Sequence, residues 1–355
     1  MKNYAIILIS DTLGGAEQIL YEVVRKFISL DSNTFEVYIL KNKTNSFWND
    51  NLPEYVRITY FDDNVMALAN SLRKKQFNCV FSSQLMMNAF LGLLRTWNIL
   101  KTKKLIVRES TSVFYRYSGS KLFKYKMAYW FGYRNIDLII TQTELMAKSL
   151  KDNIPYVWER SKIITVSNPF NLPSEQILAE QINSSDAFIV SAGRLIPEKG
   201  FDILLDSFAM ILKEFTDLKL VILGEGALRS ELEDKIHQLG ISDNVVLEGY
   251  VENVYPYFKK AKMCVVSSRL EGFPNVLLQM MSQNDKVVST TCAGGIDQID
   301  GVELSETNNV NSLYQAMKNS LNGNTSENRG KFDKELATRS IESFVGHINE
   351  ELNNE

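Results

Sequence analysis

The stretch DAFIVSAGRLIPEKGFDILLDSFAMILKEF, residues 186–215, decides the fold class. A strand-like run, DAFIVSAGRL, enters a turn with glycine at both ends, and an apolar helical run, GFDILLDSFAMILKEF, follows. Further along come a strand, LKLVILGEG, a helix, LRSELEDKIHQLG, and two more strands, NVVLEGY and KMCVVSS. This alternation is typical of a parallel sheet with helices on both faces.

The same rhythm fills the first half of the chain. YAIILIS, FEVYIL, NCVFSS, KLIVRES, DLIITQT and KIITVSNPF predict strands, and AEQILYEVVRKFIS predicts a helix. The rhythm restarts after a cluster of proline and asparagine between Asn168 and Pro173, which marks a domain boundary. With 355 residues, the chain is expected to form two Rossmann-like, doubly wound α/β domains that face each other across a cleft.

The last periodic segment, KELATRSIESFVGHINEEL, predicts a helix that packs back against existing structure. Its apolar positions suit one helical face: Leu336, Ile341, Phe344, Val345, Ile348 and Leu352. The predicted organisation is therefore a first domain over residues 1–168, a second over residues 169–330, and a C-terminal helix over residues 331–355 that crosses back to the first.

Composition excludes several classes of protein. Hydrophobic residues make up 45% and charged residues 23%, which is ordinary for a soluble globular protein. No apolar run reaches the roughly 18 residues of a membrane span, and the N-terminus does not resemble a signal peptide. The three cysteines, Cys79, Cys264 and Cys292, are far apart, which favours a reducing compartment and argues against a metal site. Only two histidines are present, which argues against zinc chemistry and a catalytic triad.

Charge is distributed unevenly along the chain. Residues 1–170 contain 23 Lys/Arg and 14 Asp/Glu, a balance of +9, and the remainder carries −12. A basic first half suggests that this half meets an anionic surface or substrate. No zinc-finger, helix-turn-helix or RNA-recognition signature is present, so nucleic acid is not an expected partner.

The turn GRLIPEKG, residues 193–200, places two cations directly after a strand. Gly193 and Gly200 bracket it and allow close backbone approach. Arg194 and Lys199 suit a diphosphate, because arginine offers a planar fork and lysine a point charge. The alternative is that both are solvated loop residues.

The stretch EGFPNVLLQ, residues 271–279, combines a carboxylate with a helix start. Free N–H groups at Asn275 and Val276 are expected to bind phosphate oxygens, helped by the helix dipole. Glu271 is a candidate acceptor for sugar hydroxyls, and Gln279 lies one turn into the helix. The alternative is an ordinary helix start with an exposed glutamine.

A paired glycine follows the first predicted strand, in DTLGGAEQ, residues 11–18. Gly14 and Gly15 would let the backbone approach a ligand at a helix N-terminus. The spacing is not the G-x-G-x-x-G of a dinucleotide fingerprint.

In this order and at these distances, the three stretches resemble the retaining glycosyltransferases of family 4, which have the two-Rossmann GT-B fold. The resemblance extends along nearly the whole chain. It is most specific in SAGRLIPEKGFDILLDSF, LVILGEG, LEGYVENVYPYFKKAKMCVVSSRLEGFPNVLLQMM and TCAGG. The family signature is Glu-x7-Glu, of which Glu271 matches the first position, whereas Gln279 stands at the second.

The resemblance implies roles for these residues. Arg194 and Lys199 would hold the donor diphosphate, Glu271 would contact the donor sugar, and Gln279 would contact the nucleotide ribose. Gly15 would lie beside the donor phosphate and the acceptor.

One departure from the family concerns the first domain. Many relatives carry a histidine after a strand, near the reacting sugar. The equivalent strand here is LIVRES, which makes Arg108 and Glu109 acceptor-side candidates. The alternative is that these two form a structural ion pair.

The segment SKLFKYKMAYWFGYRN, residues 120–135, interleaves basic and aromatic side chains. The basic residues are Lys121, Lys124, Lys126 and Arg134, and the aromatic ones include Trp130. This composition suits the headgroup boundary of an anionic bilayer, so we expect peripheral contact with the cytoplasmic face of the cell membrane. The alternative is a buried helix with a basic exposed side.

The predicted activity is retaining transfer of a sugar from a nucleotide-diphosphate sugar, with UDP-sugars favoured, to a hydroxyl. The expected acceptor is a polyprenyl-diphosphate-linked glycan in surface polysaccharide synthesis, such as lipopolysaccharide O-antigen or capsule. No cofactor or metal is expected, because no Asp-x-Asp motif is present and Arg194 and Lys199 can neutralise the leaving diphosphate. Two alternatives are a sugar-nucleotide epimerase of similar shape and a non-catalytic glycan-binding relative.

Overall fold

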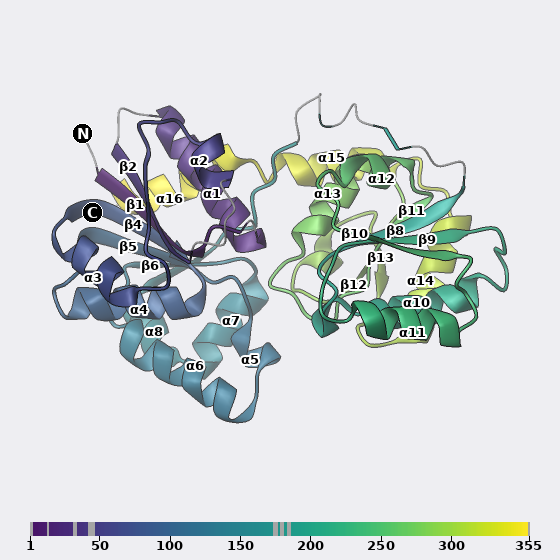
Figure 1. The fold of residues 1–355 in the computed structure, drawn as a ribbon, viewed down its shortest axis with the longest axis horizontal. Helices are drawn as coiled ribbons and strands as arrows, with labels where there is room; N and C mark the ends of the chain where they lie inside the picture. Colours follow the sequence, from purple (N-terminus) through teal and green to yellow (C-terminus); the bar gives the residue numbers. More distant parts are fainter. Residues whose placement is uncertain are drawn as a thin grey trace. The chain divides into compact units, whose positions relative to one another are not determined.

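The computed structural model describes residues 3–12, 14–30, 34–41, 47–172, 177, 181–182 and 186–353. The chain divides into two compact units. The first comprises Met1–Pro169 together with Ser340–Glu355, and the second comprises Phe170–Arg339 (Figure 1).

The first unit is built on a parallel sheet of seven strands in the order β3-β2-β1-β4-β5-β6-β7. Its strands are β1 (Asn3–Ser10), β2 (Thr34–Lys41), β3 (Arg57–Tyr60), β4 (Gln76–Ser83), β5 (Lys101–Arg108), β6 (Leu138–Thr141) and β7 (Lys162–Thr165). Its helices are α1 (Gly15–Leu30), α2 (Phe47–Asn51), α3 (Val65–Arg73), α4 (Leu85–Thr96), α5 (Val113–Arg116), α6 (Gly119–Gly132), α7 (Glu144–Asn153), α8 (Pro155–Arg160) and α16 (Ile341–Asn353).

Helices cover both faces of this sheet, which explains why its central strands read as continuous apolar runs. In β1, Ala5, Ile6 and Ile7 are fully buried and contribute alternately to two apolar clusters. One cluster includes side chains of α1, α2 and α16, and the other includes side chains of α3, α4, α6 and α8.

The second unit repeats this plan with six parallel strands in the order β10-β9-β8-β11-β12-β13. Its strands are β8 (Phe188–Ala192), β9 (Lys219–Leu223), β10 (Val245–Gly249), β11 (Met263–Val266), β12 (Val287–Thr290) and β13 (Glu303–Ser305). Its helices are η1 (Pro197–Lys199), α10 (Phe201–Ile211), α11 (Arg229–Gln238), α12 (Tyr255–Lys260), α13 (Asn275–Gln283), η2 (Ile296–Gln298), α14 (Val310–Asn322) and α15 (Asn328–Ala337). The predicted fold of two doubly wound parallel sheets is confirmed.

In each unit the strand order reverses at one point. The reversal lies between β1 and β4 in the first sheet and between β8 and β11 in the second. Loops that leave the carboxyl ends of the strands beside such a reversal diverge to opposite faces of the sheet, and the crevice between them is the usual ligand site. The predicted turns at Gly14, Gly193 and Glu271 follow β1, β8 and β11 respectively, three of these four strands.

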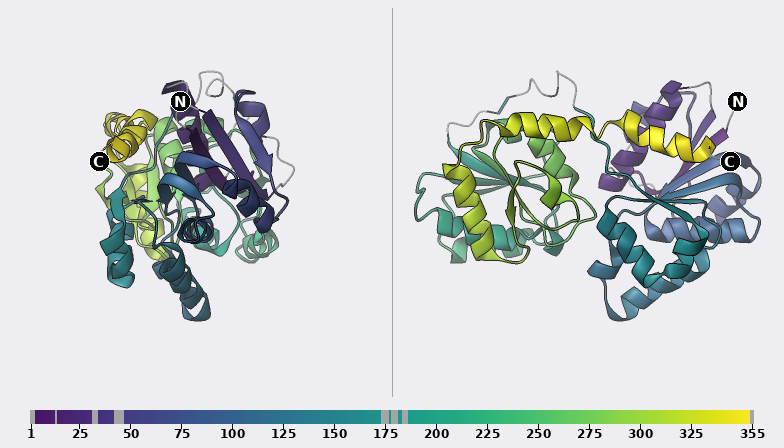
Figure 2. Two further views of the ribbon diagram at one scale, coloured as in Figure 1. Left: turned by 90° about the vertical axis from the view of Figure 1, so that its left-hand side faces the viewer. Right: turned by 180° about the vertical axis from the view of Figure 1, so that it is seen from behind.

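The C-terminal segment differs from the single predicted helix over residues 331–355. It forms two helices, α15 in the second unit and α16 in the first (Figure 2). The break falls at Ser340, whose hydroxyl accepts a hydrogen bond of 3.1 Å from the backbone N–H of Ser343 and so caps α16. Ile341, Phe344, Val345 and Ile348 complete the cluster beneath α1, whereas the side chain of Leu352 lies outside the described residues.

Among the described residues, no helix combines the length and the apolar character needed to cross a bilayer. Pro173, at the end of the predicted boundary segment, lies outside the described residues.

Candidate functional site

The turn after β8 in the second unit is held against the segment after β11. Gly200 has a left-handed φ of 64°, and a Cβ placed there would lie 2.2 Å from the carbonyl oxygen of Ser267. Only glycine fits both requirements. The Ser267 hydroxyl also donates a hydrogen bond of 2.9 Å to the carbonyl oxygen of Lys199. The two segments therefore form one framework at the reversal of the second sheet.

Arg269 braces this framework, and sequence reasoning did not single it out. Its guanidinium donates to both carboxylate oxygens of Asp202, at 2.8 and 2.6 Å, and to the carbonyl oxygen of Pro197 at 2.7 Å. Burial alone would raise the pKa of the Asp202 carboxyl, but hydrogen bonding to Arg269 and its charge outweigh burial, so the pKa is lowered. The hydrogen bond to Asp202 correspondingly raises the pKa of Arg269.

The structure joins two of the predicted catalytic residues, Lys199 and Glu271, in one ion pair. The Nζ of Lys199 lies 2.5 Å from Oε1 of Glu271, and the two side chains are 18% and 19% exposed. The hydroxyl of Ser268 donates to the same carboxylate oxygen at 3.0 Å. The aliphatic stem of Lys199 lies beside Gly193, where an added Cβ would sit 3.3 Å from it.

The ion pair fixes the position of the Lys199 ammonium but uses only part of its hydrogen-bonding capacity. A lysine ammonium has three donor hydrogens, and the carboxylate has acceptor positions to spare, so both groups can also bind a ligand. The backbone N–H of Glu271 donates to the carbonyl oxygen of Cys292 at 2.9 Å, which ties the pair to the segment after β12. Burial, helped by the charge of Glu271, raises the pKa of the Cys292 thiol to about 12, so this thiol is neutral.

Arg194, the other predicted cation, is exposed. Its guanidinium makes no hydrogen bond or ion pair with the residues that the structure describes. It therefore stands available to an anion directly after β8.

The helix predicted after Glu271 forms as α13, which begins at Asn275 after Pro274. Asn275 and Val276 are half-buried in its first turn. Gln279 is also half-buried, and its amide donates a hydrogen bond of 3.3 Å to the hydroxyl of Tyr255 on α12. Within the described part of the chain its side-chain oxygen has no partner, so Gln279 retains an acceptor for a ligand.

In the first unit, Gly14 and Gly15 connect β1 to α1 as predicted. An added Cβ at Gly14 would lie 2.6 Å from a carboxylate oxygen of Glu17, which is 7% exposed. The side-chain amide of Gln84 donates a hydrogen bond to Glu17. Gln84 follows β4 and has an unusual left-handed φ of 76°. Its bond to Glu17 links the first turn of α1 to the segment after β4.

Arg108 and Glu109 are both buried at the end of β5, at 3% and 1% exposure, but no direct ion pair joins their side chains. Arg108 donates to Asn168, whereas Glu109 accepts from the hydroxyl of Tyr129 at 2.8 Å and from that of Tyr133. Adjacent residues of an extended chain point to opposite faces, which separates the two groups.

Burial shifts the pKa values of both groups toward their neutral forms. It lowers the pKa of Arg108 to about 10, against the opposing charges of Glu109 and Glu17. It raises the pKa of Glu109, against hydrogen bonds from Tyr133 and Tyr129. The Nε and Nη1 groups of Arg108 are buried with no protein partner in the described structure.

The predicted basic aromatic segment forms α6, and its aromatic residues divide between two faces. Tyr129 and Tyr133 are buried. A second row is exposed, and it comprises Phe123 at 65%, Met127 at 37%, and Trp130 and Phe131 at 47% each. Lys121, Lys124 and Lys126 are exposed beside this row, and Arg134 lies over the rings of Trp130 and Phe131.

We call this row, Phe123, Met127, Trp130 and Phe131, the α6 apolar stripe. Its spacing places the four side chains along one side of the helix. Exposed large apolar side chains that gather in this way mark an interaction surface, unlike apolar residues scattered singly.

The match to a known protein family lies in the second unit. Residues 186–322 match the model of the family described as glycosyl transferases group 1, which supports a domain of that family here. An uncharacterized glycosyltransferase of Methanocaldococcus jannaschii is 33% identical over 198 residues, which are 53% of this chain and 48% of that protein.

A second relative, from Campylobacter jejuni, is 32% identical over 225 residues, which are 61% of this chain and 60% of that protein. It is an N-acetylgalactosamine-N,N'-diacetylbacillosaminyl-diphospho-undecaprenol 4-alpha-N-acetylgalactosaminyltransferase. The matches to these two relatives thus span about half to three fifths of their lengths.

Among solved structures, Anabaena HepE in complex with UDP and glucose has a TM-score of 0.80 and 15% identity, with 100% of both chains covered. At this identity the similarity shows the fold, and it supports the predicted GT-B class.

Proposed function

We propose that this protein is a retaining glycosyltransferase that moves a sugar from a nucleotide-diphosphate sugar to an acceptor hydroxyl. The observation that carries the proposal is the pairing of Lys199 with Glu271 at the reversal of the second sheet, with Arg194 exposed after β8. These residues lie within the segment that matches the glycosyl transferases group 1 model.

The arrangement suits stabilisation of a leaving diphosphate. Negative charge on the diphosphate grows as the bond to the sugar breaks, and cations held in place beforehand stabilise that charge most in the transition state. We assign this role to Arg194 and Lys199. Because positive charge is already present, we propose that the reaction needs no metal ion.

The remaining donor contacts follow from the same framework. Glu271 positions Lys199 and has acceptor positions left for hydroxyls of the donor sugar. Asn275 and Val276 begin a nine-residue helix, whose dipole favours phosphate oxygens at its N-terminus. Gln279 offers its side-chain oxygen to the ribose, and Gly193 leaves room for the stem of Lys199. A UDP-sugar is the favoured donor, since HepE is seen with UDP and with UDP-glucose.

We propose that the acceptor binds at the first unit, beside Gly15, Arg108 and Glu109. The Campylobacter relative acts, by its name, on an undecaprenol-linked diphosphate glycan, which supports a lipid-linked acceptor of surface polysaccharide synthesis. The exposed α6 apolar stripe with its lysines fits a protein that works at the cytoplasmic face of a membrane.

The test is a panel of UDP-, GDP- and dTDP-sugars, each labelled in the sugar, incubated with a membrane lipid extract. We expect release of nucleotide and transfer of label to the lipid fraction from one donor class. An epimerase would convert the donor without acceptor. A glycan-binding protein would leave every donor intact, which would refute the proposal.

Arg194→Ala provides the site-specific arm of this test, with Lys213→Ala as its matched control. Lys213 is an exposed cation just beyond α10, in the same unit. We expect the Arg194 variant to lose roughly 10²–10³-fold in rate and the control to retain it. Chelation of metal ions with EDTA should leave the wild-type rate unchanged, and a loss that Mg²⁺ or Mn²⁺ restores would contradict metal independence.

A further inference from the structure

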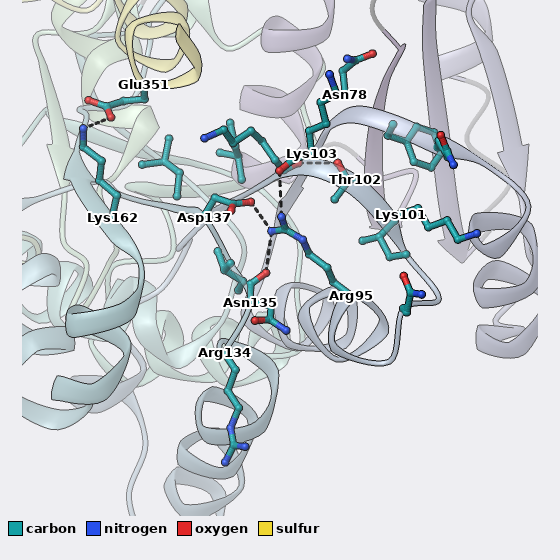
Figure 3. Close-up of a pocket in the computed structure, with 18 of the residues that line it drawn as sticks. Asn78, Arg95, Lys101, Thr102, Lys103, Arg134, Asn135, Asp137, Lys162 and Glu351 are labelled. Atoms are coloured by element: carbon teal, nitrogen blue, oxygen red, sulfur yellow. Dashed lines mark hydrogen bonds and ion pairs between the residues drawn. The ribbon is translucent and has the colours of Figure 1, made fainter. Parts of the chain in front are cut away.

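The first unit contains a polar hollow of about 990 Å³ at the amino ends of β4, β5, β6 and β7, the edge of the sheet opposite to Gly14 and Gly15 (Figure 3). We call it the basic hollow. Its origin lies in the strand register, because β6 pairs with β5 only from Ile106 onward. The residues of β5 before Ile106, beginning at Lys101, are therefore not paired with β6, and those up to Lys104 face the hollow.

The lining is strongly cationic. Seven basic side chains contribute to it and only two carboxylates do. The basic ones are Arg95, Lys101, Lys103, Lys104, Arg134, Arg160 and Lys162, and the acidic ones are Asp137 and Glu351. Each carboxylate is already paired, Asp137 with Arg95 and Glu351 with Lys162. The lining thus holds five more basic side chains than carboxylates.

Arg95 forms a fixed centre for this group (Figure 3). Besides Asp137, it donates to the carbonyl oxygens of Asn135 and Lys103, both at 3.0 Å. The carboxylate of Asp137 in turn accepts from the backbone N–H of Leu105 at 2.6 Å. These bonds join the end of α4 to β5 and to the loop before β6, so this part of the hollow is built into the fold.

Three of the excess cations have no partner within the described structure. Lys101, Lys103 and Arg160 are exposed, and their side chains make no hydrogen bond or ion pair with described residues. Gathering uncompensated like charges raises the local positive potential, which attracts and concentrates anions. Lysine and arginine together are the side chains that bind phosphate, as point charges and as bidentate donors.

We propose that the basic hollow binds a group with clustered phosphates, separately from the nucleotide-sugar site of the second unit. The inference goes beyond sugar transfer, since it assigns a second anion site to the other unit of the chain. The hollow is large enough for a diphosphate or for the phosphorylated headgroup of a lipid. Its lining is too polar to favour an apolar ligand.

Two sources can supply this chemistry: a soluble oligophosphate or a lipid headgroup. Arg134 connects the hollow with the membrane surface proposed above, because it lines the hollow and also lies 5.7 Å over the ring of Trp130 in the α6 apolar stripe. A bilayer on that stripe would therefore bring phosphates to the rim of the hollow.

The experiment uses the full-length protein and a triple charge reversal, Lys101→Glu, Lys103→Glu and Arg160→Glu. These side chains make no contact on which the Arg95 centre depends. The matched control is Lys213→Glu, Lys259→Glu and Lys262→Glu, three exposed cations of the second unit. Circular dichroism and thermal unfolding establish that both variants fold.

The soluble arm titrates inorganic pyrophosphate by calorimetry. Because pyrophosphate also resembles part of a nucleotide-sugar, the wild type is compared with Arg194→Glu as well as with the triple variant. We expect two classes of binding event, one lost in each variant. Loss in the triple variant alone would support the hollow and count against the proposed donor site, so the two proposals fail separately.

The lipid arm measures sedimentation with phosphatidylcholine vesicles that contain phosphatidic acid. Loss of vesicle binding in the triple variant, on the order of 100-fold for three cations, together with no pyrophosphate effect would identify a headgroup as the source. If the triple variant and the control behave like wild type in both arms, the hollow is not an anion site and the inference is wrong.

Discussion

Replacing Lys199 by methionine tests whether this lysine acts in sugar transfer or only in the structure. Methionine keeps an unbranched stem beside Gly193 and removes the charge. If Lys199 stabilises the leaving diphosphate, turnover should fall by roughly 10²–10³-fold, or about 3–4 kcal/mol. The loss should lie in kcat more than in KM, because the charge on the diphosphate grows in the transition state.

The structural contribution of the same residue is smaller. Exposed ion pairs contribute about 0.2–1 kcal/mol, and breaking a buried one costs about 3–5 kcal/mol. With its partners 18% and 19% exposed, the Lys199–Glu271 pair lies between these limits. We expect the free energy of unfolding to drop by about 1–3 kcal/mol, which leaves the second unit folded.

The assay combines initial rates of nucleotide release at saturating donor with urea unfolding of the same sample. Lys213→Met is the matched control, since that exposed lysine has no ion pair within the described structure. Wild-type kcat in a folded Lys199→Met protein would refute the catalytic assignment and leave Lys199 as a structural partner of Glu271.

Three further expectations follow from the site and the surface. Gln279→Ala should raise the donor KM by about fivefold with little change in kcat, and Gln279→Glu should bind donor at least as well as wild type. A wild-type KM in the alanine variant would place this side chain away from the nucleotide. Replacing the three α6 lysines by glutamate should abolish binding to anionic vesicles, at about 1 kcal/mol per charge, and equal partition of variant and wild type would contradict the membrane surface. Arg269→Met should destabilise the second unit at neutral pH. Since the folded pKa of Asp202 is lowered, this difference in unfolding free energy should shrink as the pH falls below about 4 and on through the folded pKa, and a difference that stays constant with pH would exclude the ion pair as its cause.

The sequence predicted the fold well because parallel strands that are buried on both faces appear as continuous apolar runs. YAIILIS is apolar up to its final serine, Ser10, and β1 is buried over most of its length. The division of the C-terminal segment was missed, since the helical periodicity of residues 331–355 continues across Ser340 and a single serine is a weak stop.

The sequence indicated several residues of the candidate site but not which of them contact one another. Lys199 and Glu271 were both singled out, but they are separated by 72 residues, and their contact depends on β8 and β11 being neighbours in the sheet. Arg269 was missed because an arginine in a loop looks the same whether it is solvated or bonded to Asp202. Arg108 and Glu109 are adjacent in sequence, which suggested an ion pair, yet strand geometry directs them to separate partners.

The return of α16 to the first unit also sets an order for folding during synthesis. The ribosome must complete Phe170–Arg339 before it makes the helix that closes the apolar surface beneath α1. At usual rates of translation this is a delay of roughly 10–30 s, during which the first unit lacks Ile341, Phe344, Val345 and Ile348. The second unit is continuous in sequence and can fold within that interval. The first unit therefore matures last although its synthesis begins first, and its nascent form exposes an apolar surface suited to a chaperone.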